Sequence, residues 1–201
     1  MKHIFKQGLE QHPTLVLLHG TGGNEHDLLS IGEIIDPNVS LLGIKGNILE
    51  NGMPRFFKRL AEGLFDEEDL RFRTEELHDF IEEAAQTYGF DKNNVLLLGY
   101  SNGANIAGSL LLTYGNIYQG AALLHPMVPM RQASYPSLNQ TPIFISAGRN
   151  DPICAMPETD ELIEILEEAG STVSSFWHDF GHRLTAEEVA ATKQWYQQTF
   201  N

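Results

Sequence analysis

The sequence has little cysteine, few basic residues and no long apolar run. Its single cysteine, Cys154, excludes a disulfide within the chain. The 13 Lys and Arg residues stand against 27 Asp and Glu residues, and the net charge of -14 repels phosphate backbones and anionic lipid surfaces over most of the protein surface. No apolar run approaches the roughly 20 residues that cross a bilayer. We therefore expect neither a nucleic-acid partner nor a membrane partner.

Features that mark export or division into domains are also missing. The N-terminal segment Met1–Pro13 lacks the apolar core of a signal peptide, which predicts a cytoplasmic protein. No Ser/Pro-rich linker, repeat or low-complexity tract interrupts the 201 residues, so we expect one domain over residues 1–201. Two acidic runs, 75–85 and 158–170, alternate charged and apolar residues at helical spacing. These runs predict solvated helix faces rather than a metal site.

Short runs of aliphatic and β-branched residues predict a parallel sheet, because continuously apolar strands are typically buried on both faces. Helical patterns lie between these runs: one covers Glu75–Tyr88, one follows Asn102 and one precedes Gly170. The last helix begins near Thr185, where Thr185 and Glu188 have the spacing of a capping box. This alternation predicts an α/β fold with a mostly parallel, twisted sheet flanked by helices. The six predicted strands are Thr14–Gly20, Val39–Gly46, Asn94–Tyr100, Gly120–Pro126, Thr141–Gly148 and Thr172–Asp179.

The segment Gly99–Gly103, GYSNG, matches the pattern G-x-S-x-G. It follows an apolar strand and opens a predicted helix, which is the setting that a nucleophile elbow requires. The turn is so sharp that side chains two residues to either side of the serine would collide with the neighbouring strand and helix. We predict that Ser101 is a catalytic nucleophile, and a plain tight turn is the alternative.

A serine hydroxyl needs a base to take its proton and an acid to orient that base. In sheets with this elbow the acid and then the histidine follow later in the chain. Asp151 follows the fifth predicted strand and His182 follows the sixth, so both emerge at the same sheet edge as Ser101. We predict Ser101, Asp151 and His182 as the catalytic residues. Among the other histidines, His178 lies within the last strand, and His125 ends the fourth, where we expect it to line the pocket.

The loop Leu17–Asp27, LLHGTGGNEHD, is rich in glycine and follows the first predicted strand. Acyl transfer needs donors for the developing oxyanion, and glycines let backbone amides point inward. We predict the amides of Asn102 and Thr21 as these donors, with Gly22 as the next choice. The loop lacks the third glycine of a dinucleotide fingerprint and the lysine of a P-loop, so neither kind of phosphate site is indicated.

The motifs HGTGG, GYSNGAN, GRNDPI and FGHRLT, in this order and spacing, resemble those of the carboxylesterase/phospholipase branch of the α/β-hydrolases, which includes the acyl-protein thioesterases. The segment GNILENGMPRFFKRLAEGLFDEEDL resembles small bacterial hydrolases associated with resistance to hydroquinones and other thiol-reactive compounds. The resemblance covers essentially the whole chain. It implies an α/β-hydrolase fold without a large lid domain, a triad of Ser101, Asp151 and His182, and an oxyanion hole formed by the amides of Thr21 and Asn102. A homodimer and a role in detoxification rest on this resemblance alone.

The segment 47–69 fits the alternation poorly and predicts a long excursion that either roofs an active site or packs as a surface loop. We place Arg55, Phe56 and Phe57 at the pocket mouth, where Arg55 could bind a substrate carboxylate and the aromatic rings an acyl or aryl group. The alternative is a surface cation beside local core residues. We expect Cys154 to be exposed or half-packed rather than a thiol sensor, because no cation lies near it in the sequence.

These residues predict a serine hydrolase that cleaves a small-molecule carboxylic ester or thioester with a short or compact acyl group and needs no metal or organic cofactor. Two alternatives remain open. One is a dienelactone-type or C–C bond hydrolase acting on aromatic ring-cleavage products, although the cysteine nucleophile of dienelactone hydrolases would have to stand at position 101, which is Ser101. The other is a binding or sensor protein that keeps the fold without turnover.

Overall fold

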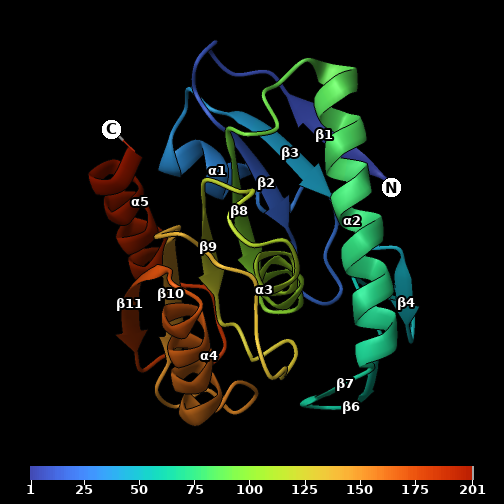
Figure 1. Cartoon of the computed structure of the whole chain (residues 1–201), viewed down its shortest axis with the longest axis vertical. Coiled ribbons are helices and arrows are strands. Elements are labelled where there is room, and N and C mark those ends of the chain that lie inside the picture. The colour runs from blue at the N-terminus through green and yellow to red at the C-terminus, as the bar shows by residue number, and fades with distance from the viewer. Residues whose placement is uncertain (201) are drawn as a thin grey trace.

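The computed structural model describes residues 1–200. Its centre is a seven-stranded sheet in the order β1-β3-β2-β8-β9-β10-β11 (Figure 1). Strand β1 is antiparallel to β3, and the other neighbouring strands are parallel. All six predicted strands are confirmed, and the edge strand β1 is an addition. The bounds are β1 (His3–Lys6), β2 (Thr14–Leu18), β3 (Ser40–Ile44), β8 (Val95–Tyr100), β9 (Gly120–Leu124), β10 (Pro142–Gly148) and β11 (Thr172–His178).

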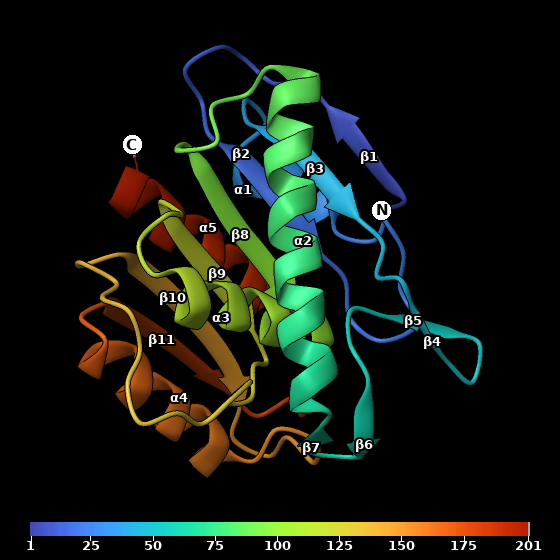
Figure 2. The ribbon, with the colours of Figure 1, turned by 45° about the vertical axis from the view of Figure 1, so that its right-hand side comes forward.

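Helices cover both faces of the sheet. Helices α2, α3 and α4 lie on one face, and α1 and α5 lie on the other (Figures 1 and 2). Helix α2 begins at Glu67, well before the predicted start near Glu75, because Asp66 caps it by accepting a hydrogen bond from the amide of Asp69 at 3.1 Å. The short helix α1 was not predicted. The bounds are α1 (Leu29–Ile35), α2 (Glu67–Tyr88), α3 (Asn102–Tyr114), α4 (Met156–Glu168) and α5 (Ala186–Phe200).

Two apolar layers explain why the central strands carry almost continuous aliphatic sequence. One layer joins the sheet to α2, α3 and α4 through the fully buried side chains of Leu77, Ile106 and Leu162. The other joins the sheet to α1 and α5 through Ile35 and Tyr196. Burial of apolar area at about 25 cal/mol per Å² is the main stabilising contribution in such a core. The sheet is therefore a rigid base for the loops at its carboxyl edge.

The segment between β3 and α2 forms two hairpins rather than an irregular loop. One pairs β4 (Ile48–Glu50) with β5 (Met53–Arg55), and the other pairs β6 (Arg59–Ala61) with β7 (Leu64–Phe65). Arg59 Nε donates a hydrogen bond to Glu50 Oε1 at 2.9 Å and ties the hairpins together. Both hairpins lie near the carboxyl ends of the parallel strands (Figure 2). They are thus placed to form one wall of a site at that edge.

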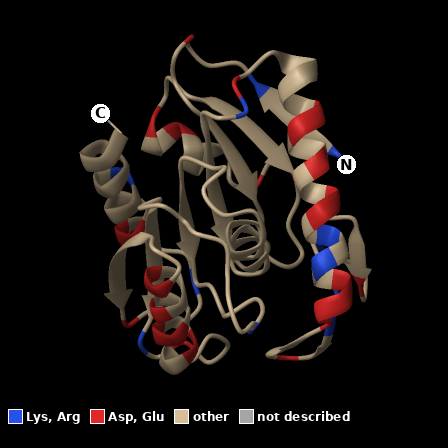
Figure 3. Ribbon diagram, viewed as in Figure 1, with Lys and Arg blue, Asp and Glu red and all other residues tan. Residues whose placement is uncertain are grey.

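The acidic runs lie where their periodicity predicts. Figure 3 shows Asp and Glu residues along the outer surfaces of α2 and α4. The apolar residues of the same helices, such as Leu77 and Leu166, are buried. Among the helices of residues 1–200, none combines the length and the apolar character that crossing a bilayer requires.

Candidate active site

Ser101 lies in a strained turn between β8 and α3. Its φ of 53° and ψ of -115° put it outside the regions that L-residues favour. Its amide donates a hydrogen bond to the carbonyl of Leu124 at 2.8 Å, which fixes the turn to β9. A Cβ at Gly99 would collide with the backbone of Gly103 and Ala104, and a Cβ at Gly103 would collide with the carbonyl of Leu18. The two glycines of the motif are therefore steric requirements of this turn.

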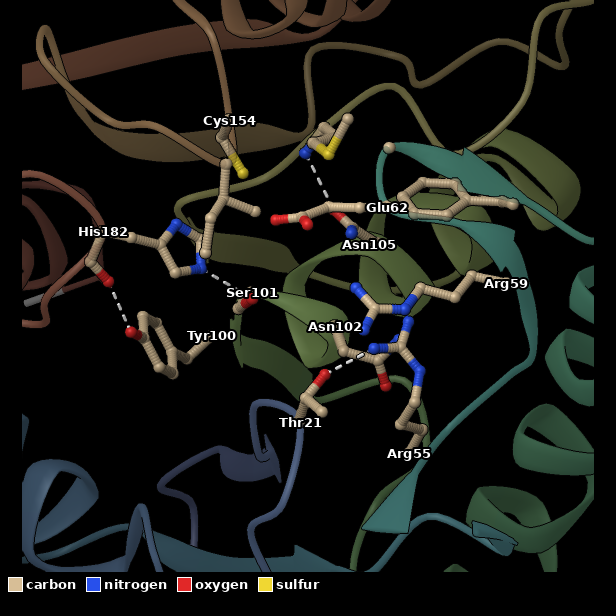
Figure 4. A pocket seen from close by; sticks show the side chains of 14 residues that line it. Thr21, Arg55, Arg59, Glu62, Tyr100, Ser101, Asn102, Asn105, Cys154 and His182 are labelled. Carbon is tan, nitrogen blue, oxygen red and sulfur yellow. Dashed lines mark hydrogen bonds between the residues drawn. The ribbon is translucent and has the colours of Figure 1, made fainter. Parts of the chain in front are cut away.

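Three loops bring the predicted triad residues together at the carboxyl edge of the sheet. Ser101 follows β8, Asp151 follows β10 and His182 follows β11. Ser101 Oγ is 2.8 Å from His182 Nε2, and His182 Nδ1 is 2.7 Å from Asp151 Oδ2 (Figure 4). The hydroxyl can donate to Nε2 while the Nδ1 proton is donated to the carboxylate. This is the arrangement that general-base activation of a serine requires.

The loop that carries His182 is held from two sides. The hydroxyl of Tyr100 donates a hydrogen bond to the carbonyl of His182 at 2.5 Å. Asn150 accepts from the amide of Gly181 at 2.8 Å and donates to the carbonyl of Asp179 at 2.9 Å. Burial raises the pKa of Tyr100 to about 12, so its hydroxyl remains a donor at neutral pH. The imidazole is thus oriented by backbone contacts as well as by Asp151.

The charges of the triad suit a proton transfer near neutral pH. Burial lowers the pKa of His182, although Asp151 opposes this shift. Burial alone would raise the pKa of Asp151, but the amides of Cys154 and Ile153 and two histidines lower it below its ordinary value. Those amides donate to Asp151 Oδ1 at 3.0 and 2.8 Å. The carboxylate is therefore charged while the imidazole is neutral and free to accept a proton.

A second histidine shares the carboxylate of Asp151, and its position corrects our expectation. His125 is completely buried and lines no part of the pocket. Its Nδ1 is 2.8 Å from Asp151 Oδ2, and its Nε2 is 3.0 Å from Glu188 Oε1. Burial would lower the pKa of His125, but Glu188 and Asp151 together raise it above the ordinary value. His125 thus lies buried between two carboxylates that favour its protonated form, behind the triad.

Glu188 is the residue of this network that sequence reasoning missed as a site component. It is completely buried, and its Oε1 accepts a hydrogen bond from Ser146 Oγ at 2.6 Å. His178 Nε2 lies 3.2 Å from Glu188 Oε2, while its Nδ1 accepts from the amide of Phe180. Burial would raise the pKa of Glu188, but His125 and Ser146 lower it to about 2. The capping-box spacing with Thr185 was the available signal, and it pointed to helix structure alone.

The two predicted oxyanion donors are the amides of Thr21 and Asn102. Within residues 1–200 neither amide donates a hydrogen bond, so both remain available to a ligand. Asn102 is the first residue of α3, where the amide has no partner inside the helix. The amide of Gly22 instead donates to the carbonyl of Pro54 at 2.9 Å. Gly22 also lies outside the pocket lining, so the structure removes it from the candidates.

A cavity of about 320 Å³ opens over Ser101. Arg55 faces it, but Phe56 and Phe57 do not: their side chains are 1% and 0% exposed and belong to the core. Phe57 packs edge-on against the ring of Phe65, at 5.1 Å between centroids. The placement of Phe56 and Phe57 at the pocket mouth is therefore wrong, and the alternative, that they are local core residues, is confirmed. The lining consists of Thr21, Arg55, Arg59, Glu62, Gly63, Phe65, Tyr100, Ser101, Asn102, Asn105, Met127, Ile153, Cys154 and His182.

Cys154 also departs from expectation, because it is 2% exposed rather than half-packed. Its thiol donates to the carbonyl of His125 at 3.3 Å, and burial raises its pKa. A thiol in this state is a poor nucleophile at neutral pH.

In the part of the chain that the structure describes, two groups of side chains have potential metal ligands within 4.8 Å of one another: His125 with Asp151 and His182, and His125 with His178 and Glu188. Both groups include His125, whose two ring nitrogens already face carboxylates. A metal ion at either place would have to displace contacts of the triad network. A mechanism without a metal or organic cofactor therefore stays our prediction.

The model of one protein family, Phospholipase/Carboxylesterase, matches residues 1–200. The chain belongs to this family. The crystal structure of the Bacillus cereus carboxylesterase is 55% identical with a TM-score of 0.98, covering 100% of this chain and 95% of that chain. MhqD of Bacillus subtilis (strain 168), a protein named as a hydrolase, is 54% identical over 98% of both chains. A structure of YahD with malic acid is 33% identical with a TM-score of 0.95 and covers 98% of each chain.

Membership gives this carboxylesterase-type hydrolase the α/β-hydrolase fold that its sheet and helices display. Within residues 1–200, the mostly parallel sheet carries five helices and no large additional domain over Ser101. The predicted family and fold are confirmed, and the roles of the individual site residues are proposals.

Proposed function

We propose that this chain is a serine hydrolase that cleaves a carboxylic ester or thioester with a compact acyl group through an acyl-enzyme intermediate. The observation that carries the proposal is the continuous hydrogen-bonded path from Ser101 Oγ to His182 and on to Asp151, at 2.8 and 2.7 Å, on the wall of a cavity. A serine on a strained elbow has no structural need for this path. The path therefore argues against a non-catalytic sensor.

In the proposed reaction Ser101 Oγ attacks the carbonyl carbon while His182 Nε2 takes the hydroxyl proton. The negative charge that develops on the carbonyl oxygen is stabilised by the amides of Thr21 and Asn102, and losing one such donor typically costs about 10²–10³ in rate. His182 then returns the proton to the leaving group. Water attacks the acyl-enzyme in the second half, with His182 again as the base. Asp151 holds the imidazole and stabilises its protonated form throughout.

The size of the cavity supports a small substrate. A volume of about 320 Å³ lies at the lower end of the range for small-molecule sites. The relative YahD was solved with malic acid, a small carboxylic acid. The resemblance of the segment 46–70 to small bacterial hydrolases of thiol-reactive stress further supports a role in detoxification.

Replacing the nucleophile tests the mechanism directly. We expect Ser101→Ala to lower kcat for p-nitrophenyl acetate by at least about 10⁴-fold, because the residual rate comes from binding and the oxyanion hole alone. The far-UV circular dichroism and the thermal unfolding midpoint should stay close to those of the wild type. Turnover within about a hundredfold of the wild-type rate in this variant would falsify the mechanism.

Two further measurements separate the alternatives. A fluorophosphonate probe should label Ser101 in the wild-type protein, whereas an unreactive serine would favour a sensor. A panel of simple esters, thioesters and lactones should show turnover of the esters or thioesters. Faster turnover of lactones or of vinylogous acids would favour a dienelactone-type or C–C bond hydrolase.

A further inference from the structure

One wall of the cavity carries two guanidinium groups. Arg55 ends β5 and Arg59 begins β6, so both hairpins contribute a cation to the space over Ser101. Figure 4 shows the two groups beside each other, across Ser101 from His182. Burial and the charge of Arg59 lower the pKa of Arg55. Two neighbouring cations repel each other, and negatively charged groups beside them stabilise the pair.

The carboxylates of the protein pair with these two guanidinium groups only in part. Glu50 is shared: its Oε1 accepts from Arg59 Nε at 2.9 Å, and its Oε2 lies 3.5 Å from Arg55 Nε. Arg55 also donates from Nε to the carbonyl of Phe57 at 3.2 Å and from Nη1 to Thr21 Oγ1 at 2.6 Å. Within residues 1–200, Arg55 Nη2 and both terminal nitrogens of Arg59 donate no hydrogen bond. The carboxylate of Glu50 is therefore shared by two guanidinium groups, and three of their terminal nitrogens have no hydrogen-bond acceptor within residues 1–200.

A third donor on the same wall is also unpaired. Asn102 is 2% exposed and lines the cavity, and its Oδ1 accepts a hydrogen bond from the amide of Phe56 at 2.7 Å. That bond fixes the orientation of the side chain and leaves Nδ2 buried, without a partner within residues 1–200. A buried donor without an acceptor is destabilising. An acceptor brought into this part of the cavity by a ligand would relieve that cost.

The reaction geometry decides which half of the substrate meets this wall. The leaving group must lie beside His182 Nε2, because that nitrogen returns the proton to it. The remainder of the acyl group then extends from the carbonyl carbon away from His182. Arg55 and Arg59 lie on that side of Ser101 (Figure 4). In this orientation the wall would contact the acyl group rather than the leaving group.

We propose that Arg55, Arg59 and Asn102 form a carboxylate-binding subsite, and that the substrates are monoesters or monothioesters of short dicarboxylic acids. The inference rests on the proposed hydrolase function. An arginine recognises a carboxylate through two parallel hydrogen bonds, which gives geometric as well as electrostatic selectivity. Because the cavity is compact, only a short carbon chain can separate the reacting carbonyl from the carboxylate.

Glu62 carries a negative charge in the same cavity, so replacing it should have the opposite effect to replacing an arginine. It lines the same cavity from the turn between β6 and β7 and is exposed. Its carboxylate repels an anionic acyl group and leaves a neutral one unaffected. Removing that charge should therefore favour anionic substrates, whereas removing an arginine should disfavour them.

The experiment compares p-nitrophenyl hemisuccinate with p-nitrophenyl 4-methylpentanoate, two esters with one leaving group and acyl chains of nearly equal shape. The measured quantity is the ratio of kcat/KM for the charged ester to that for the neutral ester, which does not depend on the folded fraction. We expect a ratio above one for the wild type, a fall of about tenfold in Arg59→Gln and in Arg55→Lys, and a rise in Glu62→Gln. Arg71→Gln, which removes an exposed cation of α2, is the matched control and should leave the ratio unchanged.

A binding measurement keeps the proposal separate from turnover. Methyl hemisuccinate should raise the unfolding midpoint of the Ser101→Ala protein by mass action, and methyl 4-methylpentanoate should raise it less. Adding Arg59→Gln to the Ser101→Ala protein should reduce the rise from methyl hemisuccinate. Equal ratios in the wild type and both arginine variants would overturn the subsite while leaving the hydrolase intact. Turnover by Ser101→Ala within about a hundredfold of the wild-type rate would overturn the hydrolase mechanism, and the binding data would still decide the subsite.

Discussion

Two histidines bind the same oxygen of Asp151, and they differ in almost everything else. His182 Nδ1 is 2.7 Å and His125 Nδ1 is 2.8 Å from Asp151 Oδ2. The His182 side chain is 14% exposed at the cavity, whereas the His125 side chain is 0% exposed. The far nitrogen of His182 faces the hydroxyl of Ser101, and the far nitrogen of His125 faces the carboxylate of Glu188. The group at the far nitrogen distinguishes His182, the proposed catalytic base, from His125, whose protonated form the two carboxylates favour.

Opposite pKa shifts follow from that difference. Burial lowers the pKa of both rings, and Asp151 raises both. Glu188 is close enough to His125 to turn the balance toward the charged form, while His182 remains below the ordinary value. When His125 is protonated, the two carboxylates and the imidazolium leave a net negative charge beside neutral His182. In the proposed reaction, this negative charge would stabilise His182 when it becomes protonated.

The largest expected effect comes from the carboxylate that the two histidines share. We expect Asp151→Asn to lower kcat for p-nitrophenyl acetate by about 10⁴-fold, because an amide nitrogen facing His182 favours the wrong tautomer. Asp179→Asn is the matched control: Asp179 is exposed and follows β11, but it makes no contact with the ring of His182. Its kcat should stay near the wild-type value. A loss below about a hundredfold in Asp151→Asn would remove Asp151 from the role of orienting acid.

Exchanging each histidine for glutamine should separate catalysis from stability. His182→Gln should abolish turnover with little change in the free energy of unfolding, because the ring is partly solvent-exposed. His125→Gln should lower the free energy of unfolding by about 3–5 kcal/mol, because it leaves two buried carboxylates without their shared cation.

Urea titration measures the unfolding energy, and kcat is taken per folded molecule. We expect the folded fraction of His125→Gln to keep kcat within about tenfold of the wild-type value, since His125 does not touch the reacting atoms. Equal stabilities of the two variants would show that His125 carries no compensating charge.

A smaller effect is expected in the pH dependence of kcat/KM, where the direction of the shift in midpoint can be predicted. His182 accepts the serine proton only in its neutral form, and its pKa lies below the ordinary 6.5. The acid limb of kcat/KM should therefore rise to its plateau with a midpoint below 6.5. The charge of His125 is one cause that lowers the pKa of His182. In His125→Gln the midpoint should move upward, and a downward shift would contradict the charged state of His125.

Much of the triad could be predicted from the sequence because each member follows an apolar run that becomes a buried strand. Parallel strands deliver their carboxyl ends to one edge, so Ser101, Asp151 and His182 converge without any knowledge of side-chain contacts. The same rule misplaced His125, which also directly follows a strand, β9. Its backbone has a φ of 55°, which the surrounding sequence does not predict, and its ring is buried rather than in the cavity.

The wall opposite His182 shows where sequence patterns are weakest. Strands β4 to β7 are two or three residues long, too short for periodicity to reveal. The pair Asn51–Gly52, with φ of 51° and 81°, was the available hairpin signal. Adjacent Phe56 and Phe57 could not be divided between core and pocket, because their burial depends on contacts with distant residues such as Phe65 and His19.

The smallest effect should come from Thr185, which shares Glu188 with His125. Thr185 Oγ1 accepts from the amide of Glu188 at 3.2 Å, and the amide of Thr185 donates to Glu188 Oε2 at 2.8 Å. Thr185→Ala removes the first bond, keeps the second and leaves the carboxylate against His125. We expect a loss of about 1 kcal/mol in the free energy of unfolding, measured in urea, with an unchanged acid limb of kcat/KM. Glu188→Gln should cost several times more, because the charge facing His125 is then lost. Equal losses in the two variants would mean that Glu188 stabilises the protein as a helix cap and not as a counter-ion.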